Sequence, residues 1–322
     1  EKPVRIVFVG TPQFAVPTLK AVVAGRHQVA MVVTQPDRRG GRGRRPLPPP
    51  VKMLAMEHGV RVIQPDSIND PHALSDIETA RPDVMLVIAY GRKLTKRALR
   101  IARLGTFNIH ASLLPKYRGA APIHYALLNG EDETGVTLQR MASAVDTGPI
   151  LAQRRTSIGP EETTGELSER LAVLAAKMIG PALDEIEGGK ATGRPQNDAE
   201  ACAAPKLSKR DGAIPWSRSA DAIHNFVRAM TPWPGGWTFL HPHAEGHPLR
   251  LVVRAVEPDD PESPEGVELG TVVQADDRLA VATGDGVVTL RRVVPEGGAE
   301  MSGGALLRGH RVSVGDRFRD SP

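Results

Sequence analysis

The sequence lacks several features that would place the protein in familiar classes. It has one cysteine, Cys202, so no internal disulfide can form, and this favours a reducing compartment. No run of about 18 apolar residues occurs, so we expect no membrane-spanning helix. No basic segment followed by an apolar stretch stands at the beginning of the given sequence, so we expect no secretory signal peptide. Together these absences predict a cytoplasmic location.

Three functional motifs are also missing or incomplete. The turn after the first apolar run reads G-T-P-Q-F rather than G-x-G-x-x-G, so a dinucleotide site is not supported. The triplet D-T-G begins at Asp146, but an aspartic protease needs two carboxylates that share a proton, and no second D-T-G exists. His241, His243 and His247 lie in what looks like an exposed turn without cysteine partners, and we predict no metal site.

The chain is long for a single core and unevenly charged. Its 322 residues favour two domains. Residues 1–208 contain 28 Lys and Arg against 21 Asp and Glu, a net charge of +7, whereas residues 209–322 contain 13 against 16, a net of −3. A nucleic-acid partner would therefore be met mainly by the first part, although this excess alone does not prove one.

Short apolar runs alternate with helical periodicity in the first half of the chain. This pattern predicts an open, mostly parallel, Rossmann-like α/β sheet, in which ligands lie beyond the carboxyl ends of the strands. The expected strands are Val4–Gly10, Val29–Thr34, Val60–Ile63, Asp83–Ala89 and Thr106–His110, and the expected helices include Val51–His58, Pro71–Ala80 and Leu94–Arg103.

The second half changes character. A T-x-x-E capping box at Thr163 opens a long amphipathic helix that ends at Gly188. A polar stretch with two prolines, 193–205, is typical of a linker. After a helix over Ser219–Met230, short strands separated by turn residues predict a small barrel of the OB type. The predicted domains are 1–190 and 209–322, joined by a linker at 191–208.

Two polar side chains stand together at the end of the fifth predicted strand. Because side chains alternate along a strand, Asn108 and His110 share one face, where they can be capping groups or a pair of donors aimed at one reacting oxygen. Asp146 suits a tight turn, but it is also a carboxylate that could orient His110 or accept a proton.

A basic stretch carries five arginines, separated in part by glycines and followed by prolines: Arg38, Arg39, Arg42, Arg44 and Arg45. It is either a disordered, solvated loop or a mobile segment that orders on a phosphate backbone. In the acidic second domain an RNA contact would require a local basic patch, and the nearest candidates are Lys206, Lys209 and Arg210 at the junction.

The string S-L-L-P-K-Y-R-G-A-A-P-I at 112–123, directly behind N-I-H, resembles the signature of the folate-dependent formyltransferases. V-F-V-G-T-P-Q-F-A-V-P near the start, the arginine-rich stretch, K-L-S-K-R-D-G-A-I-P-W at 206–216 and P-W-P-G-G-W at 232–237 narrow the resemblance to members that act on methionyl-tRNA. One departure is Ala144-Val145 where the family usually has Gly-Leu before D-T-G.

The resemblance implies the formyltransferase fold, a chemistry and a set of roles. The reaction is transfer of the formyl group from 10-formyltetrahydrofolate to the α-amino group of methionyl-initiator tRNA, without a metal. The catalytic residues are Asn108, His110 and Asp146, and the arginine-rich stretch enters the acceptor stem. The family also suggests a monomer. The residues that would hold the folate are Ser112, Leu113, Leu114 and Pro115.

Three other functions remain open at this point. A sugar-nucleotide formyltransferase shares Asn, His and Asp but not the basic stretch. A hydrolase could release formate from the same cofactor. An RNA-binding module without catalysis would need only the basic loop and the barrel. The acceptor of the formyl group distinguishes all of them.

Overall fold

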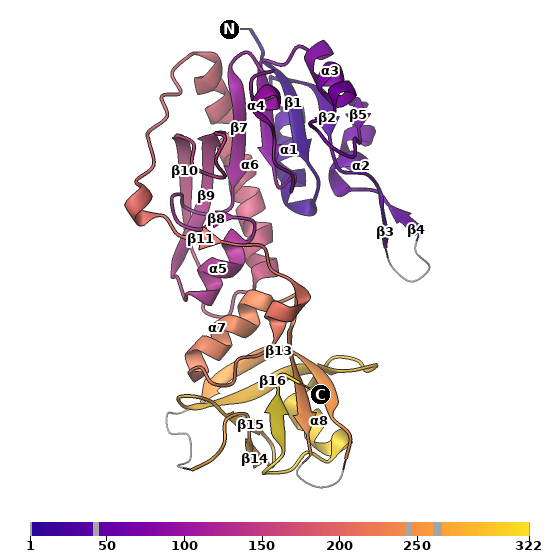
Figure 1. Ribbon diagram of the computed structural model, residues 1–322, viewed down its shortest axis with the longest axis vertical. Coiled ribbons are helices and arrows are strands. Elements are labelled where there is room, and N and C mark those ends of the chain that lie inside the picture. Colours follow the sequence, from indigo (N-terminus) through magenta and orange to yellow (C-terminus); the bar gives the residue numbers. More distant parts are fainter. Residues whose placement is uncertain (1, 41–44, 243–245, 260–265, 322) are drawn as a thin grey trace. The chain divides into compact units, whose positions relative to one another are not determined.

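The computed structural model describes residues 2–40, 45–242, 246–259 and 266–321, and it divides into two compact units (Figure 1). Unit 1 comprises Glu1–Pro122, Glu133–Ser157 and Ser168–Pro205. Unit 2 comprises Ile123–Asp132, Ile158–Leu167 and Lys206–Pro322. The division therefore does not fall at a single point of the chain.

Unit 1 is built on a seven-stranded sheet in the order β10-β9-β7-β6-β1-β2-β5. β5, β2, β1, β6 and β7 run parallel, as the alternating pattern predicts, and β9 and β10 add an antiparallel hairpin. This hairpin was not predicted, because E-T-G-V-T-L-Q-R carries polar side chains on a buried strand. The strands are β1 Arg5–Gly10, β2 Gln28–Val33, β5 Val62–Ile63, β6 Val84–Ile88, β7 Gly105–His110, β9 Glu133–Arg140 and β10 Ile150–Ser157.

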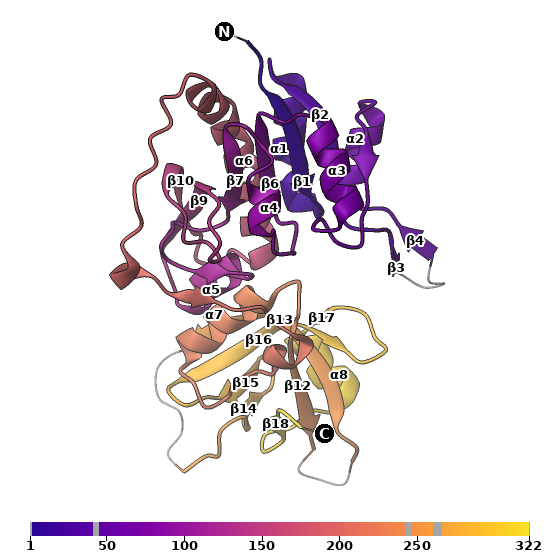
Figure 2. The ribbon, with the colours of Figure 1, turned by 45° about the horizontal axis from the view of Figure 1, so that its top comes forward.

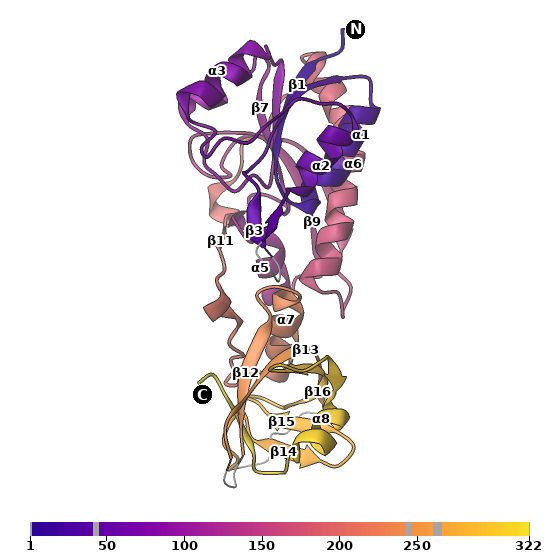
Figure 3. The same cartoon turned by 90° about the vertical axis from the view of Figure 1, so that its right-hand side faces the viewer.

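Helices cover both faces of this sheet. Figure 3 shows α3 on one side of the strands, and α1 and α6 on the other. The α3 and α4 face buries a core that includes Val7, Met31, Ile77, Met85 and Ala98. The helices are α1 Val16–Ala24, α2 Pro50–Glu57, α3 Pro71–Thr79, α4 Lys96–Leu99 and α6 Thr164–Glu187, of which the residues from Ser168 belong to unit 1.

The predicted helix Leu94–Arg103 is wrong in its length. α4 has only four residues, beginning after the Thr95 cap, whose side chain accepts from the Ala98 N–H. The hydroxyl of Thr106 donates to the carbonyl of Leu99 at 3.0 Å, so the chain has already turned back toward β7. Apolar spacing alone does not register such a tertiary hydrogen bond.

Part of the arginine-rich stretch forms a small hairpin of β3 (Arg38–Gly40) and β4 (Arg45–Leu47). Figure 2 shows both strands lying beyond the main sheet rather than in it. Residues 41–44 are outside the described part of the chain, so Arg42 and Arg44 are not placed. Near the start of the hairpin, Lys52 and Gln64 contact the carboxylate of Asp37, which holds its pKa below the usual value.

The segment expected to be a linker packs along unit 1 as far as Pro205. Arg194 forms a bridge to Ile150, and β11 (Ala203–Ala204) pairs in parallel with β8 (Arg118–Gly119). A short 3-10 helix, Asp198–Glu200, lies between these contacts. Of the predicted linker 191–208, only the residues after 205 belong to unit 2.

Unit 2 contains a near-closed antiparallel barrel in the order β14-β15-β16-β13-β12-β18, which confirms the predicted OB-like barrel. A bridge between Thr271 and Arg317 joins the first and last strands of that order. The strongly amphipathic α7 (Ala220–Met230) begins at the Ser219 cap and packs on β12, β13 and β16. The remaining elements are α5 Pro122–Leu128, β12 Gly236–His241, β13 Leu249–Asp259, β14 Val272–Ala275, β15 Leu279–Ala282, β16 Val287–Pro295, β17 Met301–Ser302, α8 Gly303–His310 and β18 Arg317–Arg319.

Candidate active site

The strand order of unit 1 reverses direction at β1, which has β2 on one side and β6 on the other. In open α/β sheets this switch point, at the carboxyl ends of the strands, is where ligands bind. Gly10 ends β1 there, and a Cβ on it would lie 2.9 Å from the carbonyl oxygen of Ile88. The close approach of β1 and β6 at this edge therefore requires glycine.

One face of the sheet turns from apolar to polar near the same edge. Asn108 of β7 pairs with Val87 of β6 and Gln139 of β9, and His110 pairs with Thr137. Cross-strand partners share a face, so Asn108 and His110 lie on the face that carries Val87 and, farther away, the α3 core. Asn108 is half-buried and His110 is 6% exposed.

The structure brings His110 and Asp146 together. Asp146 lies in the turn between β9 and β10 with a positive φ of 53°, and its Oδ2 is 3.6 Å from Nδ1 of His110. Both side chains are largely shielded from solvent. An Asp in a left-handed turn position is tolerated better than most residues, which suits the D-T-G sequence.

The second ring nitrogen of His110 is also engaged. Its Nε2 lies 2.8 Å from the carbonyl oxygen of Tyr117, an atom that only accepts, so Nε2 carries a proton in this contact. Both ring nitrogens thus face oxygen acceptors, and the ring donates to both only when it carries two protons.

The carboxylate of Asp146 is held by two further donors. The N–H of Gly119 donates to Oδ2 at 3.0 Å, and the side-chain amide of Gln139 donates to Oδ1 at 2.8 Å. Gly119 has a φ of 128°, and a Cβ there would lie 2.5 Å from the carbonyl oxygen of Ala204. Glycine therefore lets β8 and β11 approach while its N–H points to the carboxylate.

Gln196 fixes the turn that carries Asp146. Its Nε2 donates to the carbonyl oxygens of Asp146 at 2.9 Å and Gly148 at 2.7 Å. Its Oε1 accepts from the guanidinium of Arg118 at 2.8 Å, and Arg118 also pairs with Asp198. Gln196 therefore ties the segment after α6 to two loops of the candidate site.

The S-L-L-P loop follows β7 directly, and much of it is bonded internally. Ser112 is fully buried and donates to the carbonyl of Lys116 at 2.6 Å. The N–H of Leu114 donates to the hydroxyl of Thr137, and its carbonyl accepts from Gln153. Leu114 is buried, whereas Leu113 and Pro115 are half-buried. The side chains best placed for a ligand are therefore Leu113 and Pro115, rather than Ser112.

Sequence reasoning missed Gln139, Gln196 and the backbone groups of Tyr117 and Gly119. Gln139 lies on a strand that the polar pattern concealed, and Gln196 lies in the stretch interpreted as a linker. No sequence motif marks a glutamine at either position, so the residues could not be identified from the sequence. The pairing of β8 with β11 and the hydrogen bonds of Gln196 show that this segment belongs to the site.

The basic candidates fall into two groups. In the hairpin, the guanidinium of Arg38 donates to the side chain of Gln35. At the start of unit 2, Lys206, Lys209 and Arg210 are exposed. Lys209 and Arg210 begin a 3-10 helix, Lys209–Gly212, that a reciprocal contact between Ser208 and Asp211 caps. The same contact lowers the pKa of Asp211.

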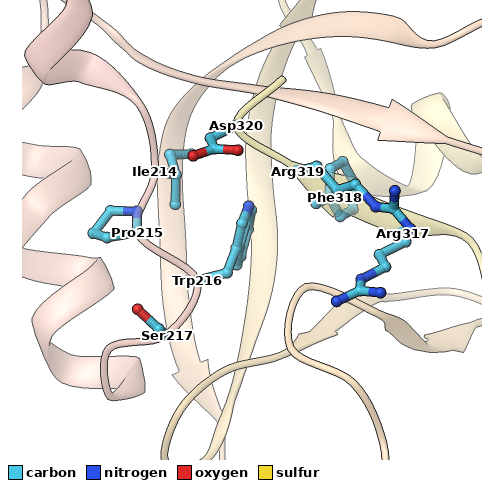
Figure 4. Close-up of a pocket in the computed structure, with 8 residues that line it drawn as sticks. All are labelled: Ile214, Pro215, Trp216, Ser217, Arg317, Phe318, Arg319 and Asp320. Carbon is cyan, nitrogen blue, oxygen red and sulfur yellow. The ribbon is translucent and has the colours of Figure 1, made fainter. Parts of the chain in front are cut away.

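No ligand is assigned to the histidine segment 241–247 or to the pocket of unit 2. The described residues contain no group of three side chains arranged to hold a metal ion. His241 contacts the carbonyl of Ser321, while His243 lies outside the described residues. A pocket of about 590 Å³ in unit 2 lies between Ile214–Ser217 and Arg317–Asp320 (Figure 4). The two aromatic rings that line it, Trp216 and Phe318, are buried and pack on each other with their ring centroids 5.5 Å apart.

Comparison with known proteins agrees with this geometry. Residues 4–183 match the formyl transferase family and residues 206–311 match its C-terminal domain. The chain belongs to the formyl transferase family. A methionyl-tRNA formyltransferase of Citrifermentans bemidjiense is 42% identical over 97% of this chain and 95% of its own length. One of Methylococcus capsulatus is also 42% identical, over 96% of this chain and 98% of its own.

Solved structures show the same formyl transferase fold. An N-formyltransferase from Helicobacter canadensis, in complex with folinic acid and dTDP-3-aminofucose, has a TM-score of 0.64 at 17% identity, covering 89% of this chain and 99% of its own. HypX from Aquifex aeolicus with tetrahydrofolic acid has a TM-score of 0.60 at 17% identity, covering 97% of this chain and 48% of its own. Among the described residues of this formyl transferase, no helix has both the length and the apolarity to cross a bilayer.

Proposed function

We propose that this formyl transferase moves the formyl group of 10-formyltetrahydrofolate to the α-amino group of methionyl-initiator tRNA. The observation that carries the proposal is the pairing of His110 with Asp146 beside Asn108, at the carboxyl end of β7. Relatives that share about two residues in five over nearly the whole chain are named methionyl-tRNA formyltransferases.

The proposed reaction begins with attack of the neutral amine on the formyl carbon. An α-amino group has a pKa of about 7.7–8.0, so a useful fraction is neutral near pH 7. An oxyanion develops as the C–N bond forms, and the side-chain amide of Asn108 donates to it. His110 is the second proposed donor. Its Nε2–H, which donates to Tyr117 in this structure, would have to share that proton with the oxyanion.

One proton must then change places. The attacking nitrogen loses a proton, and the N10 nitrogen of the folate gains one as its bond to the formyl carbon breaks. Asp146, held by Gly119 and Gln139, orients the imidazole and helps to remove the proton from the amine, directly or through water. The products are formylmethionyl-tRNA and tetrahydrofolate, and no step needs a metal.

The folate is proposed to lie at the switch point of β1 and β6 and against the Ser112–Pro115 loop. There Leu113 and Pro115 supply apolar surface. The internal bonds of Ser112 and Leu114 keep the loop in place next to Asn108 and His110.

Two groups of basic residues are proposed to contact the tRNA, because the phosphates of its backbone are negatively charged. The segment Arg38–Arg45 is assigned to the acceptor stem, and Lys206, Lys209 and Arg210 to the body of the tRNA. In this assignment residues 1–190, together with the packed segment that extends to Pro205, form the catalytic domain, and residues 209–322 form the tRNA-binding domain. The enzyme acts as a monomer in the cytoplasm, where charged tRNA is found.

The test supplies 10-formyltetrahydrofolate together with one of three acceptors: charged initiator tRNA, an amino-sugar nucleotide or water alone. We expect formylation of the tRNA only. Formylation of the sugar would make the enzyme a sugar-nucleotide formyltransferase, and release of formate without an acceptor would make it a hydrolase. Binding of tRNA without any formyl transfer would leave an RNA-binding module.

A further inference from the structure

The outer face of β12 carries a row of aromatic side chains. Along this strand Thr238 and Leu240 are buried, whereas Trp237, Phe239 and His241 are half-buried and alternate with them. The rings of Trp237 and Phe239 meet edge to face, with centroids 6.0 Å apart and an interplanar angle of 81°. Two large rings therefore reach the surface of the barrel side by side.

Arginines flank these rings on both neighbouring strands. Phe239 pairs with Arg250 of β13 on one side and with Arg319 of β18 on the other. The guanidinium carbon of Arg250 lies 5.6 Å from the ring centroid of Trp237, within cation–π range. We call Trp237, Phe239, Arg250 and Arg319 the aromatic face.

The aromatic face continues into the basic junction. The indole N–H of Trp237 donates to the carbonyl of Lys209 at 2.8 Å, and Trp237 also bridges to Ala213. The 3-10 helix that carries Lys209 and Arg210 is thus fixed against the first ring of the row.

The cations of the aromatic face and of the junction differ from four other arginines of unit 2. Arg278, Arg291, Arg292 and Arg317 each lie within ion-pair distance of a carboxylate. Within the described part of the chain, the side chains of Lys209, Arg210, Arg250 and Arg319 form no ion pair. Residues 209–322 carry a net charge of −3, so these four cations without a carboxylate partner stand against the overall charge of the domain.

We propose that the aromatic face binds unpaired nucleotides of an RNA, with bases stacked on Phe239 and Trp237 and phosphates contacted by Arg250 and Arg319. Rings interleaved with unpaired cations are the combination that single-stranded nucleic acid requires. An acidic protein would use the cations but would not need two neighbouring rings. The choice of tRNA as the RNA rests on the proposed function.

The test measures binding of charged initiator tRNA to the full chain and three variants at two salt concentrations. Phe239→Leu removes a ring but keeps apolar bulk, and we expect the Kd to rise about fivefold or more. Arg319→Gln should weaken binding and lower the salt slope by about one. Arg291→Gln removes the same charge from a paired arginine of the barrel and should change neither quantity.

A second measurement reports stacking directly. In a Trp233→Phe background two indoles remain. Trp216 is buried, and Trp237 is half-buried on the aromatic face. A short single-stranded oligoadenylate should quench Trp237 fluorescence, and Phe239→Leu should weaken that titration, whereas a double-stranded RNA of equal charge should quench little. Thermal unfolding of each variant within a few degrees of the parent shows that the barrel is intact.

The proposal is overturned if Phe239→Leu and Arg319→Gln bind tRNA with the parent Kd, or if an acidic peptide competes and the oligonucleotide does not. Its failure differs from failure of the proposed function. If only the aromatic-face proposal fails, the parent still formylates charged tRNA. If the proposed function fails, the parent transfers no formyl group to tRNA, whatever the aromatic face binds.

Discussion

Nδ1 of His110 lies 3.6 Å from Oδ2 of Asp146, although one residue ends β7 and the other stands in the turn after β9. Other groups hold both residues as well, the carbonyl of Tyr117 for His110, and Gly119 and Gln139 for Asp146. The pair is therefore a fixed part of unit 1, and the first two predictions concern Asn108, which shares the strand face of His110, and the pair itself.

Asn108→Ala should lower kcat by about 10²–10³, because a donor to the developing oxyanion is lost in a site shielded from water. Folate and tRNA binding should persist, since the side chain is only half-buried and its strand neighbours remain. Steady-state kinetics with charged tRNA check this. Turnover close to that of the parent would remove Asn108 from the mechanism.

His110→Ala and Asp146→Ala should not act independently. Residues that work as a unit show non-additive losses, so the double variant should be only slightly slower than the slower single variant. The measurement is kcat for the parent, both single variants and the double variant under identical conditions. If the two factors multiply fully, the residues act separately despite their proximity.

Gln196→Ala should lower kcat roughly tenfold to a hundredfold, with little change in KM for tRNA. Gln196 is a positioning residue, because it holds the backbone on either side of the Asp146 turn, and small displacements of a catalytic group are costly.

The matched control for Gln196 is Asn197→Ala. Asn197 is the neighbouring amide, and within the described part of the chain its side chain bonds only inside its own turn, to Ala199 and Glu200. If Gln196 had a purely structural role, Gln196→Ala would unfold at a lower temperature than Asn197→Ala, but the two variants would have the same kcat.

Stability of unit 2 should fall as the pH drops below about 6.5. Burial lowers the pKa of His124, although its contact with the Trp233 carbonyl raises it in part. The unfolded chain therefore binds a proton at a pH where the folded chain does not, so unfolding is favoured on acidification until the folded pKa is passed. The loss of Tm between pH 7.5 and 5.5 should be smaller in His124→Gln, and an equal loss in both proteins would refute this origin.

Arg42→Ala should reduce kcat/KM for initiator tRNA more than for elongator methionine tRNA, and it should leave the folate KM unchanged. Arginine can contact a guanine edge through two hydrogen bonds, and such a bidentate base contact is worth roughly 1–3 kcal/mol of discrimination.

Arg61→Ala removes one exposed cation elsewhere in unit 1 and is the control for Arg42→Ala. An equal loss for both tRNAs, with a shallower salt dependence, would make the arginine segment a non-selective electrostatic contact.

The parallel strands could be predicted because buried strands of this kind read as continuous β-branched runs, such as V-R-I-V-F-V-G. The β9–β10 hairpin could not, because Thr137 and Gln139 are buried through their hydrogen bonds rather than through apolarity. Asn108 and His110 could be placed on one face from strand alternation. The residues alone left Asp146 as either a turn former or a partner of His110, and the family resemblance favoured the second interpretation.

The segment after α6 shows the limit most clearly. Its polar and proline-rich composition predicts a linker, but β11 and Gln196 bind it to the loops around Asp146. Such long-range hydrogen bonds leave no periodic trace in a sequence. A shortened chain meant to keep the candidate site intact must therefore extend to Pro205, because a chain that ends near Arg194 would lack Gln196.

The central claim is tested most directly by following an isotope-labelled formyl carbon from 10-formyltetrahydrofolate in a single turnover with charged initiator tRNA. Mass spectrometry of the released aminoacyl group should show the label on the α-amino nitrogen of methionine with the parent enzyme. Label transfer should be slowed at least a hundredfold in His110→Ala, whose folate and tRNA binding are measured in parallel. Label in free formate or on another acceptor, or full transfer by His110→Ala, would contradict the assigned chemistry.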